Sequence, residues 1–148
     1  YGLNDNFDKV NGHVIPAMIT KFVEAKKKQL KQIKLLGTGK PIREFIHSDD
    51  LAEAIVKCLN TPNYKIRNKF KSKFPLINVG TGEFISILNL SKLVAKYVNF
   101  KGKILFNKNF PDGTFKKNLN SSKIYNLGWR PKIKLKDGLK EVINLRLN

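Results

Sequence analysis

Twice in this chain, an extended segment is followed by a helix cap or a turn and then by a helix. This alternation strongly limits the folds that the chain can adopt. In the first unit, a strand over residues 44–47 is followed by Ser-Asp-Asp, as cap and acidic first turn, and by a helix over residues 51–59. In the second unit, a strand over residues 76–79 is followed by a Gly-Thr-Gly turn and a helix over residues 87–98. Such alternation favours an α/β fold in which helices pack on a small, mostly parallel or mixed sheet.

The segments on either side of these units add further elements. Apolar residues at helical spacing predict a helix over residues 14–29, in which Pro16 is tolerated because it falls in the first turn. The Lys-rich stretch 61–74 contains Pro62 and is predicted to be an exposed loop. Shorter elements complete the pattern, namely strands over residues 32–36 and 103–106, a helix near residues 121–126, and a final amphipathic helix through Leu139, Val142, Ile143 and Leu145.

Length and composition are those of one compact domain over residues 1–148, since 41% of the residues are hydrophobic and can form a core. No run approaches the roughly 20 apolar residues that span a bilayer, so no membrane partner is expected. The chain starts with neither Met nor a signal pattern, and we expect it to begin inside a longer protein. The lone cysteine, Cys58, lies in a helical apolar pattern and is predicted to be a buried, inert thiol in a reducing cytoplasm.

The formal net charge of +18 raises the alternative of a basic module that binds nucleic acid. Nearly all of the excess is Lys rather than Arg, and it is scattered through every segment together with abundant Asn. A compositional bias explains this pattern better than a dedicated nucleic-acid surface. We therefore expect no nucleic-acid partner, and keep the basic module as the alternative from a different functional class.

Two Gly-x-Gly turns, at residues 37–39 and 80–82, invite comparison with dinucleotide-binding folds. Neither turn has the third glycine three residues further on, which the close approach of a helix start to a pyrophosphate requires. The sequence therefore predicts that a complete nicotinamide site is absent from these residues.

A more specific string is Arg-Glu-Phe-Ile-His-Ser-Asp-Asp-Leu-Ala over residues 43–52, which resembles the signature of the extended short-chain dehydrogenases that act on nucleotide sugars. Further strings lie at residues 1–7 (Tyr-Gly-Leu-Asn-Asp-Asn-Phe), 11–17 (Asn-Gly-His-Val-Ile-Pro-Ala), 77–82 (Ile-Asn-Val-Gly-Thr-Gly), 111–114 (Pro-Asp-Gly-Thr) and 127–129 (Leu-Gly-Trp). In this order and spacing they resemble the GDP-L-fucose synthase family.

The resemblance covers essentially the whole chain but only the back half of a family member. Family members begin with a Rossmann domain that carries the glycine fingerprint, followed by a Ser, a Cys and a Tyr-x-x-x-Lys pair, and none of these matches a residue here. The resemblance thus implies an α/β substrate-binding part whose Rossmann core is missing and whose NADP is bound mostly by that missing part. It also implies inactivity of the chain alone, a GDP-sugar substrate, and a homodimer when the protein is complete.

The reaction implied by the resemblance is conversion of GDP-4-keto-6-deoxy-D-mannose to GDP-L-fucose, by epimerisation on both sides of the ketone and reduction of the ketone by NADPH. His13 matches the family's acid, at the start of a helix and close to the nicotinamide, and imidazole is suited to giving back a proton near neutral pH. Taken alone, His13 could equally be a capping or packing residue. His47, at a strand end before a helix cap, is predicted to be structural.

Five residues match substrate contacts of the family. Arg43 could grip the diphosphate with its planar fork, while Lys21 keeps a basic group at a substrate position and Lys117 is a weaker phosphate candidate. Asp112 is implied to accept hydrogen bonds from sugar hydroxyls or base N–H groups. Leu36 stands where the family usually has Trp and cannot stack as an indole does, so another nucleotide-sugar epimerase or dehydratase stays open as an alternative. No metal site is expected.

Overall fold

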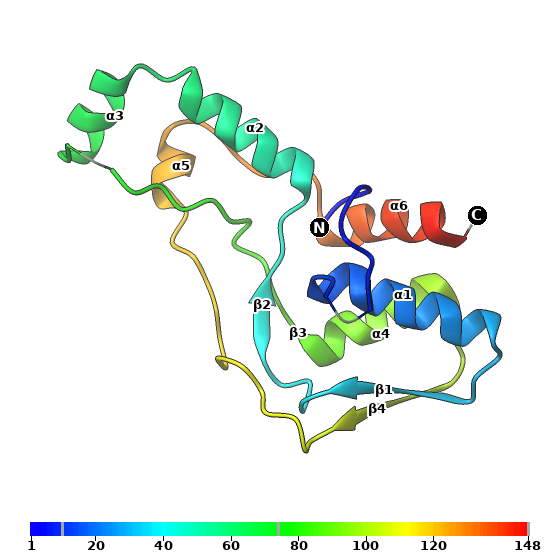
Figure 1. Ribbon diagram of the computed structural model, residues 1–148. Coiled ribbons are helices and arrows are strands. Elements are labelled where there is room, and N and C mark those ends of the chain that lie inside the picture. The colour runs from blue at the N-terminus through cyan, green and yellow to red at the C-terminus, as the bar shows by residue number, and fades with distance from the viewer. Residues whose placement is uncertain (10, 74, 148) are drawn as a thin grey trace.

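The structure, a computed structural model, describes residues 1–9, 11–73 and 75–147 of the chain (Figure 1). Its helices are α1 (Val14–Lys27), α2 (Ser48–Leu59), α3 (Asn63–Phe70), α4 (Ile87–Val98), α5 (Ser122–Asn126) and α6 (Leu135–Leu147). Its strands are β1 (Gln32–Leu36), β2 (Ile42–Glu44), β3 (Phe84–Ser86) and β4 (Lys103–Asn107). Among the described residues, none of the helices has the length and apolar content needed to cross a membrane.

The main hydrophobic core lies where α1, α4 and α6 pack together beside a two-stranded parallel sheet of β1 and β4 (Figure 1). In α4 the apolar side chains recur every four residues, and Leu90, Val94 and Val98 are fully buried. In β1 the buried side chains recur every two residues, since Ile33 and Leu35 are buried while their neighbours along the strand are exposed. The amphipathic periodicities thus orient both helix and strand toward one core.

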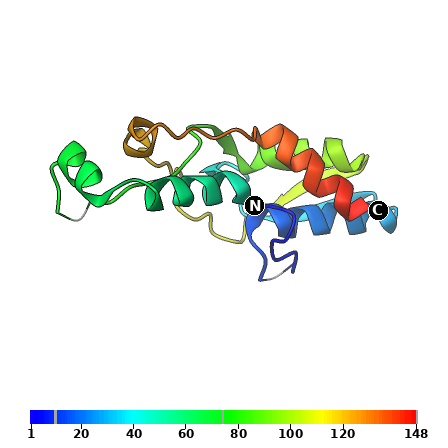
Figure 2. The same cartoon turned by 90° about the horizontal axis from the view of Figure 1, so that it is seen from above.

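A second, smaller apolar cluster contains Ala54 of α2, Ile124 of α5 and Trp129. Seen from above, α2, α3 and α5 extend away from the three-helix body, so the molecule is elongated (Figure 2). The antiparallel pair of β2 and β3 lies between two bodies, the three-helix body and the body formed by α2, α3 and α5 (Figure 1). Ile42 lies opposite Ser86, and Glu44 lies opposite Phe84. The α/β class with small sheets is confirmed, and the structure resolves the mixed sheet into one parallel and one antiparallel pair.

Three predicted elements are wrong. The strand expected over residues 44–47 is instead Ile42–Glu44, because these residues pair with β3. The stretch 61–74 is not all loop, because residues Asn63–Phe70 form α3; Lys and Arg are good helix formers, Pro62 fits the N-cap, and Ile66 finds a buried position. The prediction for residue 74 lies outside the described residues. Residues 76–79 form no strand, because Ile77 and Val79 pack on the smaller cluster without a ladder partner. Their apolar character reflects burial rather than strand pairing.

Smaller differences concern helix ends. α1 ends at Lys27 rather than at Gln29, because Gln29 takes a left-handed backbone conformation with φ 52°. α2 begins at Ser48, and the N-cap is His47, whose Nδ1 accepts a hydrogen bond from the Asp49 amide at 3.3 Å. The structural role predicted for His47 agrees with this cap and its burial. Cys58 was predicted to be buried and is half-buried, and this burial raises the pKa of its thiol.

Candidate functional site

A cavity of about 520 Å³ lies where β2, the Gly-Thr-Gly turn at residues 80–82 and the loop before α5 meet. Three cationic side chains line it, namely Arg43 on β2 and Lys116 and Lys117 on the loop. Its apolar lining comes from Ile46, Val79 and Leu119, and its remaining lining residues are Glu44, Gly80 and Asn118. The cavity can therefore offer positive charge and apolar surface to the same ligand.

Arg43 reaches from β2 toward the loop that contains the Asp-Gly turn. Its Nη1 donates a hydrogen bond to the Ile42 carbonyl at 2.7 Å, which fixes the root of the guanidinium. A Cβ atom added at Gly113 would lie 3.4 Å from Arg43 Nη2, so the guanidinium lies beside that turn. Two residues of the predicted substrate site, Arg43 and Lys117, are thus brought together by strand and loop.

The loop at residues 108–119 is attached to the rest of the molecule through backbone hydrogen bonds and through two carboxylates, those of Asp112 and Glu44. Ile42 donates its amide to the Phe115 carbonyl at 2.8 Å and accepts from the Lys117 amide at 3.3 Å. Asp112 accepts from the Thr38 amide at 2.8 Å and from the Thr38 hydroxyl through its second oxygen. The Thr38 hydrogen bonds, first that of the hydroxyl, and the nearby charges of Lys40 and Arg43 hold the pKa of Asp112 below its usual value.

Leu36 lies close to this attachment, as the last residue of β1 and directly before the turn that Thr38 occupies. Its side chain is exposed, so it presents apolar surface to solvent next to Asp112. Leu36 and Asp112 belong to the edge of the cationic region, and neither lines the cavity itself.

His13 and Lys21 lie on a different element, α1, and neither lines this cavity. His13 is the N-cap residue of α1, but its side chain makes no capping hydrogen bond and is 85% exposed, so neither capping nor packing accounts for it. Its Nδ1 lies 3.4 Å from an Asp5 carboxylate oxygen. Lys21, half-buried, follows about 12 Å further along the helix axis. The first turn of α1 is the part of this helix nearest to β2 (Figures 1 and 2).

Both glycine turns use their amide groups within the chain. The Thr38 amide donates to Asp112, and the Gly82 amide donates to Glu44 Oε1 at 2.7 Å. These amides are the groups that a pyrophosphate would need to meet, so in the part of the chain that the structure describes the two turns do not fit a dinucleotide. The same part contains no cluster of three or more His, Cys, Asp or Glu residues that could hold a metal ion.

Two residues of this site were not singled out by sequence reasoning. Lys116 was hidden among many lysines, although its place beside Lys117 at a strand-like position was a usable signal. Glu44 is a charged residue inside the specific string at residues 43–52, and its carboxylate contacts two distant segments of the chain. Neither contact follows from local spacing.

Comparisons with known proteins show which family the chain belongs to. The family described as "NAD dependent epimerase/dehydratase family" matches residues 1–80, more than half of the chain. The chain is 42% identical over 141 residues to GDP-L-fucose synthase 1 of Arabidopsis thaliana, covering 95% of this chain and 41% of that protein. It is 37% identical over 139 residues to the GDP-L-fucose synthase of Escherichia coli strain K12, covering 94% of this chain and 43% of that protein.

Among solved structures, the chain resembles the GDP-mannoheptose C4 reductase MlghC from Campylobacter jejuni, determined with NADP bound. The TM-score is 0.82 at 33% sequence identity, and the match covers 100% of this chain and 50% of that one. The chain spans about 40% of the length of the curated relatives it matches. On the match over residues 1–80, the chain belongs to the NAD dependent epimerase/dehydratase family.

Proposed function

We propose that this chain provides the GDP-sugar site and the proton donor of an NADP-dependent enzyme that converts GDP-4-keto-6-deoxy-D-mannose to GDP-L-fucose. The observation that carries the proposal is the cavity in which Arg43, Lys116 and Lys117 converge beside apolar walls. Relatives that are 37–44% identical to the chain and bear the name GDP-L-fucose synthase support the choice of substrate.

A nucleotide sugar matches this cavity in both charge and shape. Its diphosphate needs fixed cations, and the planar guanidinium of Arg43 can bind two phosphate oxygens at once while the two lysines act as point charges. The apolar side chains of Ile46, Val79 and Leu119 can contact the faces of a base or sugar. Leu36 and Asp112, outside the cavity lining, are proposed to contact the outer part of the ligand.

His13 is the proposed acid. The Asp5 carboxylate oxygen, 3.4 Å from Nδ1, can accept a hydrogen bond from the Nδ1 proton and so orient the ring. This leaves Nε2 to deliver a proton to a sugar carbon. A base of the cofactor-binding part would take a proton from the carbon beside the ketone and leave an enolate, and His13 would protonate that carbon from the opposite face, which inverts it. Lys21, further along α1, is proposed to contact the anionic part of the substrate.

The proposal assigns the cofactor mostly to a second, cofactor-binding part, with His13 close to the nicotinamide. NADPH supplies a hydride when it is bound there.

An exposed apolar stripe on α2, made of Leu51, Ile55 and Leu59, supports contact of this chain with the cofactor-binding part, because a helix that is apolar on more than one face is normally buried. Tyr1 pairs with the residues around the start of α2, because its amino group donates to the Ile46 carbonyl and its carbonyl accepts from the Ser48 amide. A cytoplasmic homodimer of the complete protein, which light scattering would check, belongs to the same proposal.

A titration of the chain with GDP tests the proposal. We expect GDP to bind more tightly than UDP, and Arg43→Ala to weaken GDP binding by roughly 10- to 100-fold, because hydrogen bonds between charged groups contribute about 1.5–3 kcal/mol. Arg67→Ala on α3 is the matched control, since it removes the same charge from an exposed helix away from the cavity. Calorimetry gives each affinity, and thermal unfolding checks that both variants are folded.

The alternatives give other results in the same experiment. UDP binding that equals or exceeds GDP binding would favour another nucleotide-sugar epimerase or dehydratase. Binding to a single-stranded RNA oligonucleotide that exceeds GDP binding and falls steeply with salt would favour a nucleic-acid module. Equal effects of the Arg43 and Arg67 substitutions would remove the cavity from the proposal.

A further inference from the structure

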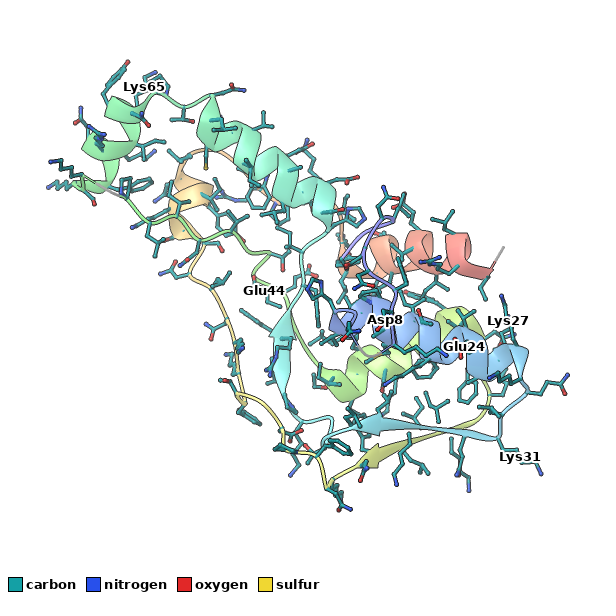
Figure 3. All side chains as sticks on the ribbon, viewed as in Figure 1. Asp8, Glu24, Lys27, Lys31, Glu44 and Lys65 are labelled. Atoms are coloured by element: carbon teal, nitrogen blue, oxygen red, sulfur yellow. The ribbon has the colours of Figure 1, made fainter. Side chains whose placement is uncertain are left out.

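Glu44 holds together two segments that are far apart in the sequence. One carboxylate oxygen accepts the Gly82 amide at 2.7 Å, and the other accepts the Leu119 amide at 3.2 Å. Glu44 is the last residue of β2, and Figure 3 shows its side chain in the region between the two bodies of the molecule. The bridge thus ties the glycine turn to the loop that carries Lys116 and Lys117.

The close approach of Glu44 to the turn depends on the residue at position 80. A Cβ atom at Gly80 would lie 2.5 Å from Glu44 Oε1, so a larger residue there would displace the carboxylate. From the other side, the Tyr125 hydroxyl donates to the Gly80 carbonyl at 2.8 Å. Burial, and after it the charge of Glu44, raises the pKa of Tyr125, so this hydroxyl keeps its proton. The turn is therefore a fixed support for Glu44.

The charge of Glu44 is unfavourable for an anionic ligand, because the residue lines the same cavity as the three cations. Coulomb repulsion alone would make a carboxylate here weaken diphosphate binding. A carboxylate that also fixes the lysine loop has the opposite effect, since the loop residues must stay opposite Arg43 to meet both phosphates. The two effects predict changes of opposite sign when the charge is removed.

We propose that Glu44 is a positioning residue of the GDP-sugar site, which holds Lys116 and Lys117 opposite Arg43 through its bond to the Leu119 amide. The proposal rests on the function proposed above. A chain with a neutral side chain at position 44 would have less negative charge in the cavity and still bind the diphosphate more weakly.

The test is a double-mutant cycle on GDP affinity. Glu44→Gln keeps the size of the side chain but leaves only one acceptor oxygen, and we expect it to weaken GDP binding by about tenfold. Glu44→Asp keeps the charge but shortens the reach, and should also weaken binding. In a chain that already carries Lys117→Ala, Glu44→Gln should cause a clearly smaller loss, because the loop then has one cation fewer to position.

Amide chemical shifts of Gly82 and Leu119 report whether the bridge is lost, and thermal unfolding separates a local change from a global one. Tighter GDP binding by Glu44→Gln, or an equal loss with and without Lys117, would overturn the positioning role. If the unsubstituted chain and Arg43→Ala behave as proposed while both Glu44 variants bind like the unsubstituted chain, only the Glu44 proposal is wrong. Absence of GDP binding by the unsubstituted chain would overturn both.

Discussion

At the residue scale, His13 is the proposed acid, and its side chain is exposed to solvent. It lies at the start of α1 with an almost fully accessible ring, and its one described ionic neighbour is Asp5. A histidine in this state contributes little to folding, so its substitution should affect chemistry rather than stability.

We expect His13→Gln to lower the exchange of substrate ring protons with solvent by about 10²- to 10⁴-fold, the usual contribution of a general acid or base. The measurement is deuterium uptake from D₂O, in a protein that joins this chain to the cofactor-binding part of the Escherichia coli relative. NADP affinity and thermal stability serve as controls and should change little. Undiminished deuterium uptake would remove His13 from the proposed role.

The residues of the site that could be predicted from the sequence are those that lie within a specific motif. Arg43 lies in the most specific string, and the structure brings it to the same cavity as Lys117. Lys116 was missed among many lysines, whereas Glu44 could not be predicted, because its role depends on long-range contacts between β2, a glycine turn and a loop. Asp112 was expected to face substrate, and here both of its oxygens contact Thr38.

At the element scale, the link between α2 and the segment before α6 depends on a buried carboxylate. Asp50 is 2% exposed and accepts hydrogen bonds from the amides of Lys132 at 3.0 Å and Ile133 at 2.9 Å. This segment runs from Trp129, in the smaller cluster, to α6 in the main core. Asp50 thus couples the two apolar clusters.

We expect Asp50→Ala to reduce the free energy of unfolding by about 3 kcal/mol, because the amides of Lys132 and Ile133 lose a buried, charged acceptor. Asp49→Ala is the matched control; this neighbouring carboxylate is exposed in the first turn of α2, and its loss should cost less than about 1 kcal/mol. Urea denaturation gives both values. A cost no greater than that of the control would contradict the role of Asp50.

The elements themselves were predicted where one face of the pattern is buried. Helices α1, α4 and α6 follow from apolar periodicity, since their stripes form the main core. β3 was missed because three residues are too few to show alternation, and its pairing with β2 is a long-range contact. α3 was missed because its lysines outweigh a short apolar stripe in composition, although they do not oppose helix formation.

At the scale of the whole molecule, the outer face of α2 is an apolar surface that the described residues leave exposed. We expect the pair Ile55→Ser and Leu59→Ser to leave the stability of the chain within about 0.5 kcal/mol, since these side chains are 50% and 78% exposed. Association with a separately produced cofactor-binding part should weaken by about 100-fold or more, because each apolar side chain buried contributes about 1.5–3 kcal/mol.

Leu145→Ser on α6 is the matched control, because Leu145 is 55% exposed on a different helix. Calorimetric titration of one part with the other measures the association. An equal loss for both sets of substitutions would contradict the assignment of α2 as the contact face. Self-association of the chain that the α2 substitutions abolish would indicate a second copy instead.

The central claim is that the cavity between β2 and the loop at residues 116–119 binds the diphosphate of a GDP-sugar. The most direct measurement is the GDP affinity of the chain and of its Arg43→Ala and Arg67→Ala variants at one salt concentration. We predict binding that Arg43→Ala weakens by roughly 10- to 100-fold and that Arg67→Ala leaves within about twofold. No measurable GDP binding by a folded chain, or an equal loss in the two variants, would contradict the claim.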